Sequence, residues 1–121
     1  MSDKPVIDRL QVKNGRTLAV VNSPKNIEAT FADAQASAIG DADVVLLFVA
    51  ARAEFDAGLA KHLPKLKPTA IFWVAYPKLT SKLAGDLSRD VIHELAPDHG
   101  LDTVSQIAID DDWSALRLKR V

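Results

Sequence analysis

The sequence predicts an α/β fold, a small three-layer sandwich with a mostly parallel sheet and a C-terminal antiparallel hairpin. Three short runs are apolar without interruption, which is typical of parallel strands that are covered on both faces. Apolar residues three or four positions apart follow the second and third runs and predict the covering helices. Strands that alternate with helices and are joined by right-handed crossovers form a sandwich of Rossmann-like type.

The predicted parallel strands are residues 18–21, 44–49 and 70–75. Between the first two lies the least regular part of the chain, segment 22–43. It could hold one helix capped by Asp33, with a weak apolar stripe, and a short strand at 28–31.

Two helices are predicted from apolar stripes. The first follows residue 49, and Pro64 could divide it into two pieces. The second should end near Ala96, because Pro97 disturbs it, with Gly100 beyond its end and either Asp86 or Ser88 as its N-cap. The two stripes are Phe55, Leu59, Leu63 and Leu66, then Leu83, Leu87, Val91, Ile92 and Leu95.

The end of the chain alternates in character at 102–109 and again at 114–119, which predicts two strands. Only residues 110–113 separate them, too few for a crossover connection, so the pair should be antiparallel. The final strand, 114–121, is expected to lie at the edge of the sheet. There it could pair across a homodimer, although its cationic residues would also guard such an edge.

The composition of the chain excludes several classes of protein. A chain of 121 residues fits a single domain, 1–121, with residues 1–9 expected to be a partly ordered N-terminal segment. The net charge of -1 offers no overall field for nucleic acid or an anionic membrane, so neither is expected as a partner. The absence of cysteine excludes disulfides and thiol nucleophiles, and no apolar run has the length of a signal or membrane segment, so a cytoplasmic location is expected.

Longer stretches of the sequence resemble a family of small bacterial proteins catalogued as domain of unknown function 3052. The resemblance covers nearly the whole chain from Leu10 onward, and its most specific parts are WVAYPK at 73–78 and IDDDWS at 109–114. It implies a small Rossmann-like fold and no established activity.

The layout also resembles, more distantly, the later half of class I S-adenosylmethionine-dependent methyltransferases. Those enzymes carry a Leu-Lys-Pro-Gly-Gly turn where this chain has LKPT at 66–69, and their fold also ends in an antiparallel hairpin. Their glycine-rich cofactor loop is missing, since no glycine lies between Gly15 and Gly40. Segment 21–44 is also too short for the units that carry the ribose-binding acid. No standard nucleotide cofactor is therefore expected.

In open parallel sheets, ligands bind beyond the carboxyl ends of the strands. Lys25, Arg52 and Lys78 follow the three predicted strands and could converge on an anionic group, which implies a small anionic ligand, a phosphate or carboxylate compound. The alternative is that these are ordinary surface cations and helix caps. The candidate binding residues are Asn22, Ser23, Lys25, Arg52, Tyr76, Lys78, Thr80 and Ser81.

Other motifs are weaker. Tyr76 lacks the lysine four residues later that a Tyr-x-x-x-Lys pair requires, because position 80 is threonine. The run 110–112 is three aspartates, which favour a hairpin turn over a magnesium or calcium site. His93-Glu94 lacks the second histidine of a zinc motif, and the three histidines are expected to face solvent, so no metal site is predicted.

Two functions from different classes remain. The favoured one is a non-catalytic ligand- or partner-binding module without a standard nucleotide cofactor. The alternative is a small enzyme or transferase that acts on an anionic substrate at the carboxyl edge of the sheet, with its catalytic residues unassigned.

Overall fold

The computed structural model describes residues 5–32 and 34–121. Among these residues it contains five strands, three α-helices and three short 3₁₀ helices. The strands are β1 (Leu18–Val21), β2 (Val44–Phe48), β3 (Ile71–Pro77), β4 (Leu101–Ala108) and β5 (Trp113–Arg120). The helices are α1 (Val6–Arg9), η1 (Lys25–Phe31), α2 (Arg52–His62), η2 (Leu63–Lys65), α3 (Arg89–Leu95) and η3 (Ala96–His99).

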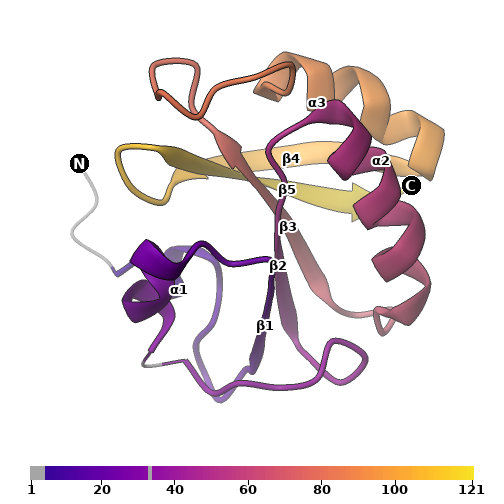
Figure 1. Cartoon of the computed structure of the whole chain (residues 1–121). Coiled ribbons are helices and arrows are strands. Elements are labelled where there is room, and N and C mark those ends of the chain that lie inside the picture. Colours follow the sequence, from indigo (N-terminus) through magenta and orange to yellow (C-terminus); the bar gives the residue numbers. More distant parts are fainter. Residues whose placement is uncertain (1–4, 33) are drawn as a thin grey trace.

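The strands form one mixed sheet in the order β1-β2-β3-β5-β4. β1, β2 and β3 are parallel, and β5 is antiparallel to both of its neighbours, β3 and β4. The predicted α/β class and the C-terminal hairpin are therefore confirmed. The carboxyl end of β3 lies beside the hairpin turn, because Pro77 pairs with Trp113 at the start of β5 (Figure 1).

The expectation that the final strand lies at the edge is wrong, because β5 is inserted between β3 and β4. The burial of the two strands reflects this order. β5 pairs with a strand on each side, so its residues 113–116 are all buried, whereas residues 104–106 of the edge strand β4 are exposed. β4 also contains a bulge between Thr103 and Gln106, a common device at sheet edges. The edge strands of the described sheet are β1 and β4.

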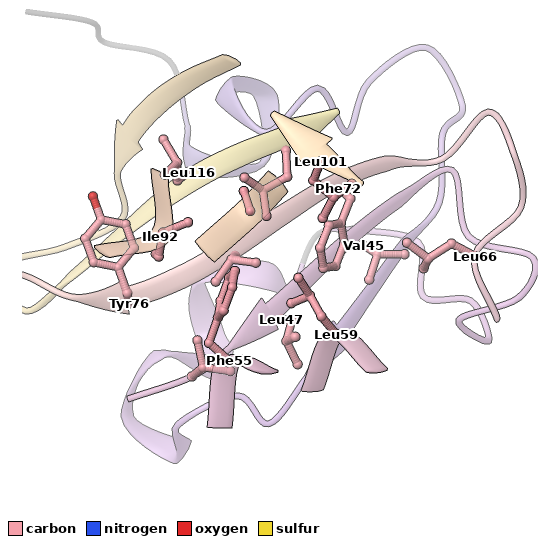
Figure 2. Packing of buried hydrophobic residues seen from close by; sticks show 14 of the residues in the cluster. Val45, Leu47, Phe55, Leu59, Leu66, Phe72, Tyr76, Ile92, Leu101 and Leu116 are labelled. Atoms are coloured by element: carbon pink, nitrogen blue, oxygen red, sulfur yellow. The ribbon is translucent and has the colours of Figure 1, made fainter. Parts of the chain in front are cut away.

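Helical segments cover both faces of the sheet, which makes the third layer. α2 and α3 lie on one side and α1 on the other (Figure 1). The first face packs Phe55, Leu59 and Ile92 of the helices against alternate strand residues such as Val45 and Leu47 (Figure 2). The second face has a separate core, built from Leu10, Val12, Leu18, Ile27, Phe31, Val44, Leu46, Phe48, Trp73, Ala75, Ile109, Trp113 and Ala115.

The N-terminal segment is attached to the second face. Leu10 is fully buried, and its carbonyl oxygen accepts a 3.0 Å hydrogen bond from Nε1 of Trp73 in β3. That bond satisfies the indole N–H inside the core. Residues 6–9 of the predicted partly ordered segment form α1, and 1–4 lie outside the described residues.

Segment 22–43 differs from its prediction. A strand at 28–31 does not form, because Ile27 and Phe31, which are both buried, are four residues apart and place a helical turn against the sheet as η1. Asp33, the predicted cap, lies outside the described residues. Farther on, residues 35–37 run beside β1, where Ala36 makes an isolated bridge to Leu18.

The helix after β2 stops at His62 and continues as η2 around Pro64, as predicted. The helix after β3 begins later than its apolar stripe suggests. Ser88 is its N-cap and its hydroxyl accepts from the N–H of Val91 at 3.3 Å, so Leu83 and Leu87 lie in the preceding loop.

Asp86, the other cap candidate, serves a different helix: its carboxylate accepts a 2.9 Å bond from the backbone N–H of Arg52 at the start of α2. Within the described residues no helix is long and apolar enough to cross a membrane.

Candidate anion-binding cleft

An open cleft of about 590 Å³ lies at the carboxyl end of β3, where the loop to α3 passes the ends of β4 and β5. The lining residues come from five parts of the chain, which the sheet order brings together. They are Arg9, Tyr76, Lys78, Leu79, Thr80, Arg89, Gln106, Ile107, Ala108 and Ser114.

The loop that forms one wall is held by the hairpin turn. The N–H of Lys78 donates to the carbonyl oxygen of Asp112 at 2.8 Å, and the hydroxyl of Ser81 donates to the Asp112 carboxylate at 2.8 Å. A turn bond from the N–H of Ser81 to the carbonyl of Lys78 closes the loop. Because a bond across 34 positions fixes its backbone, Lys78 is presented at a defined place beside the cleft.

Three cationic side chains line the cleft, and its lining includes no carboxylate. Two of them are oriented by neutral acceptors: Arg9 donates to the carbonyl of Ala108 at 3.3 Å, and Arg89 to the side-chain oxygen of Gln106 at 3.4 Å. Lys78 takes part in no ion pair among the described residues. The cleft therefore has a positive potential that its own lining does not neutralise.

Tyr76 lies at the base of this positive cleft. It is only 4% exposed, and its hydroxyl has no hydrogen-bond partner among the described residues. Burial raises the pKa of Tyr76 above its ordinary value of 10.0, and this effect exceeds the lowering by Arg89 and by the Ser114 hydroxyl, while the nearby Asp90 carboxylate raises the pKa further. The Ser114 hydroxyl is close to the phenol but does not meet the geometry of a hydrogen bond. At neutral pH the phenol is therefore a neutral donor. Figure 2 shows Tyr76 at the end of the core cluster opposite Leu66.

The structure distributes the predicted binding residues over more than one place. Tyr76, Lys78 and Thr80 line the cleft, and Ser81 is engaged with Asp112. Asn22 lines a second, smaller cleft of about 290 Å³ beside α2.

The other three predicted residues line neither of these clefts. The hydroxyl of Ser23 is directed at the carbonyl of Pro24 at 3.3 Å, and Arg52 and Lys25 begin α2 and η1. The predicted meeting of Lys25 and Arg52 with Lys78 is thus not the arrangement found around the 590 Å³ cleft.

Four polar residues that line the cleft were not predicted from the sequence: Arg9, Arg89, Gln106 and Ser114. They reach the cleft because β5 is inserted between β3 and β4, and because α1 packs on the second face. Arg89 could have been predicted, because it is the first residue of the helix that follows the strand carrying Tyr76, directly after the cap residue Ser88. The start of such a helix lies at the same edge of the sheet as the end of the strand. Arg9 had no comparable signal.

The smaller cleft contains His62, whose pKa is lowered by burial and then by Lys65 and Lys61. Its Nδ1 atom is buried without a hydrogen-bond partner among the described residues. The prediction that the histidines face solvent is therefore wrong for His62. It is also wrong for His99, which is half-buried and bonded to Asp56 at 2.9 Å, but His93 is exposed.

The aspartate run forms the hairpin turn. Oδ1 of Asp110 accepts from the N–H groups of Asp112 and Trp113, both at 2.8 Å, as an Asx turn does. Asp112 binds Ser81, and Asp111 is exposed. In residues 5–32 and 34–121 no group of three His, Cys, Asp or Glu side chains is placed to hold a metal ion.

The order and arrangement of the strands and helices are similar to the Rossmann-like folds of methyltransferases. The whole chain superposes on the Bacillus subtilis tRNA methyltransferase TrmK with a TM-score of 0.58 at 10% identity, and covers 67% of that chain. A ribosomal protein L11 methylase from Lactobacillus delbrueckii subsp. bulgaricus gives 0.50 at 13% identity, with 95% of this chain and 63% of that one covered. LepI in complex with SAM gives 0.50 at 10% identity, covering 96% and 39%.

The sequence itself assigns the family. Residues 10–121 match the family described as Protein of unknown function (DUF3052), and the chain belongs to that family. No curated protein matches the sequence. The family assignment confirms the resemblance carried by 73–78 and 109–114, and the structural similarities confirm the methyltransferase-like fold.

Proposed function

We propose that this protein is a binding module for a small anion, a phosphate or carboxylate compound, held in the 590 Å³ cleft without catalysis and without S-adenosylmethionine. The observation that carries the proposal is the composition of the cleft. Arg9, Lys78 and Arg89 surround it without a carboxylate in the lining, above a buried tyrosine hydroxyl that lacks an acceptor.

The side chains suit an anion with several oxygen atoms. A guanidinium group can donate two parallel hydrogen bonds to a carboxylate or phosphate, and an ammonium group adds a point charge. The phenol of Tyr76 could supply one further donor, and an oxygen acceptor there would satisfy a buried group that is otherwise unpaired. The positive charges and the neutral phenol donor thus both favour a ligand with several anionic oxygen atoms.

Binding is favoured over catalysis because the lining of the cleft lacks a side chain suited to move a proton at neutral pH. It contains neither a carboxylate nor an imidazole, and burial raises the pKa of Tyr76, which keeps the phenol protonated. A transferase acting on an anion in this cleft would need its base from outside the lining residues.

The absence of S-adenosylmethionine is inferred from the connection after β1. Methyltransferases of this fold place the cofactor beside a glycine-rich turn that lets the backbone approach closely. Here that turn begins with Asn22, a residue with a Cβ atom in the left-handed conformation at φ 60°, and continues through Pro24 into η1. The likeness to TrmK and the L11 methylase concerns the fold.

Isothermal titration calorimetry with inorganic phosphate, citrate and S-adenosylmethionine tests the proposal. We expect the parent to bind at least one of the two anions, more weakly as salt is raised, and not to bind S-adenosylmethionine. Lys78→Gln and Arg89→Gln should each weaken anion binding by about tenfold, the order expected for loss of one charge-assisted hydrogen bond. Lys82→Gln is the matched control, because Lys82 is exposed in the same loop and does not line the cleft.

Two outcomes would contradict the proposal. One is that neither anion binds the parent at millimolar concentration. The other is that the Lys82 variant loses as much affinity as the Lys78 and Arg89 variants, which would mean that the anions respond only to overall charge.

A further inference from the structure

A second hollow, of about 210 Å³, adjoins the 590 Å³ cleft. We call it the bulge hollow, because it lies at the irregular part of β4 between Thr103 and Gln106. Arg89 and Gln106 line both hollows, so the 3.4 Å hydrogen bond between their side chains lies at the boundary. A ligand held by Arg89 in the cleft can therefore extend into the bulge hollow.

The polar side chains that border the bulge hollow lie on the face of the sheet that α3 covers. The hydroxyl of Thr103 is 2.8 Å from Nδ1 of His93 in α3, and the amide oxygen of Gln106 accepts from Arg89, also in α3. Gln106 is opposite Leu116, which belongs to the core below α2 and α3 and also lines the hollow. Residues directly opposite each other in an antiparallel pair lie on the same face of a sheet. The strand register and the hydrogen bonds therefore agree on this face.

The bulge itself adds backbone polar groups. Two residues of β4, 104 and 105, separate Thr103 from Gln106, whereas the partners of those two residues in β5 are separated by Arg117 alone. Such a bulge leaves its extra residue without a partner in the ladder. Because β4 is an edge strand of the described sheet and residues 104 and 105 line the hollow, unpaired N–H and C=O groups are available to a ligand there.

The chemistry of the bulge hollow differs from that of the cleft. Among the described residues that line it, Arg89 is the only charged one, and it is shared with the cleft. The Thr103 hydroxyl keeps a donor or an acceptor whichever role His93 takes, and the Gln106 amide has both kinds of group. Alcohol groups also donate and accept, so they match this lining. A second anionic group would find no further cation, and an alkyl chain would leave the polar groups unpaired.

We infer that the ligand is a phosphate monoester of a small polyol or sugar, with its phosphate among the cations of the cleft and its hydroxyl groups in the bulge hollow. This inference rests on the proposed function and deepens it by naming the organic part of the anion. A phosphate ester has three terminal oxygen atoms and nearly two negative charges, which suits three cations and a phenol. The hollow is several times larger than the roughly 30 Å³ that one water molecule occupies, so a few hydroxylated carbon atoms fit.

Calorimetric titration with glycerol 1-phosphate and propyl phosphate tests the inference, with inorganic phosphate as the reference. The two esters have the same phosphate group and the same number of carbon atoms, and they differ only in two hydroxyl groups. We expect the parent to bind glycerol 1-phosphate about tenfold more tightly than propyl phosphate, the order expected for one or two hydrogen bonds. Amide signals of residues 103–105 should also shift with glycerol 1-phosphate more than with propyl phosphate.

Thr103→Val removes the hydroxyl with little change of volume, and it should lower the ratio of the two affinities about fivefold. Gln106→Leu should lower the same ratio, because the amide is lost. Thr69→Val is the matched control, since Thr69 is exposed and lines neither hollow, and it should keep the ratio of the parent. A general loss of stability would weaken both esters together and would not change the ratio. If the Thr103 and Gln106 variants do not fold, the amide shifts of the parent still give the answer.

The inference is overturned if the parent binds the two esters equally, if Thr103→Val keeps the same ratio as Thr69→Val, or if glycerol 1-phosphate at saturation leaves the signals of 103–105 unchanged. Binding of inorganic phosphate in any of these cases would leave the proposed function in place. If neither inorganic phosphate nor either ester binds, the proposed function fails and the inference fails with it.

Discussion

At the scale of single residues, Tyr76 is the side chain on which the candidate cleft depends most. Tyr76 lies near the end of β3, and the structure buries both its ring and its hydroxyl oxygen. A buried phenol without a partner lowers the stability of the fold, and such features occur where a protein binds a ligand.

Tyr76→Phe therefore separates stability from binding. Without ligand, the variant should be as stable as the parent or more stable by up to about 1 kcal/mol, because it removes a buried group that lacks a partner. Urea denaturation measures this difference, and phosphate or citrate titration should show weaker binding by the same variant. A loss of stability of about 1 kcal/mol or more would mean that the hydroxyl has a protein partner, such as its cross-strand neighbour Ser114.

Asp43 is a second residue with an identifiable role, at the amino end of the sheet. Its carboxylate pairs with Lys67 and accepts from the N–H of Thr17 at 2.9 Å, which connects the starts of β1 and β2 to the turn before β3. The hydrogen bond from Lys67 is the largest influence that lowers the pKa of Asp43 below its ordinary value of 3.8, followed by that from Thr17.

The sign of this shift sets a pH dependence. Because the pKa is lower in the folded state, the contribution of Asp43 to stability is present above 3.8 and is lost as the pH falls through the folded-state value. The parent should therefore be more stable than Asp43→Asn at neutral pH, and the difference should shrink as the pH falls below 3.8, as measured by urea denaturation. Asp41→Asn, an exposed neighbour, is the control. A parent-to-variant difference that stays constant with pH would contradict the role of the carboxylate charge.

At the scale of elements, the hairpin turn between β4 and β5 positions both the sheet and the cleft. Asp110 holds the turn through two backbone N–H groups, and Asp112 holds the loop that carries Lys78. Adjacent aspartates thus have separate structural tasks, which explains why a run of carboxylates is tolerated here.

Asp110→Ala should destabilise the protein by about 1 to 2 kcal/mol, because two backbone donors lose their acceptor. Asp111→Ala should change the stability by less than about 0.5 kcal/mol, since that side chain is exposed. Thermal or urea unfolding of the two variants makes the comparison. Equal effects at the two positions would show that the turn does not depend on the Asx bonds.

Elements with a strong local signal could be predicted from the sequence, and those decided by distant contacts could not. The buried strands β1, β2 and β3 and the break at Pro64 were recognisable because continuous apolar runs and proline act locally. The start of α3 was not, since Leu87 continues the helical spacing but is buried in a loop, while Asp86 caps α2 instead. The interior position of β5 depends on pairing with β3, which no local pattern encodes.

At the scale of the whole molecule, the fold places two different hollows at the two ends of one sheet. The carboxyl end presents a polar, cationic cleft and the amino end a small apolar cavity with a cationic rim. Candidate cations and hydroxyls at the carboxyl edge could be named from the sequence, because strand ends can be located from the apolar runs. It could not say which of them meet, since Arg9 and Arg89 reach the cleft through helix packing and not through strand order.

We propose that this methyltransferase-like fold holds a small anion beside β3 without the cofactor. The most direct measurement is a nuclear magnetic resonance titration of the ¹⁵N-labelled protein with phosphate or citrate and, separately, with S-adenosylmethionine. The anion should shift the amide signals of residues 76, 78–80, 89, 106–108 and 114 saturably, and S-adenosylmethionine should leave the signals of 21–23 and 25 unchanged. Saturable shifts at 21–23 and 25 with S-adenosylmethionine, together with no response to either anion around Lys78, would contradict this expectation.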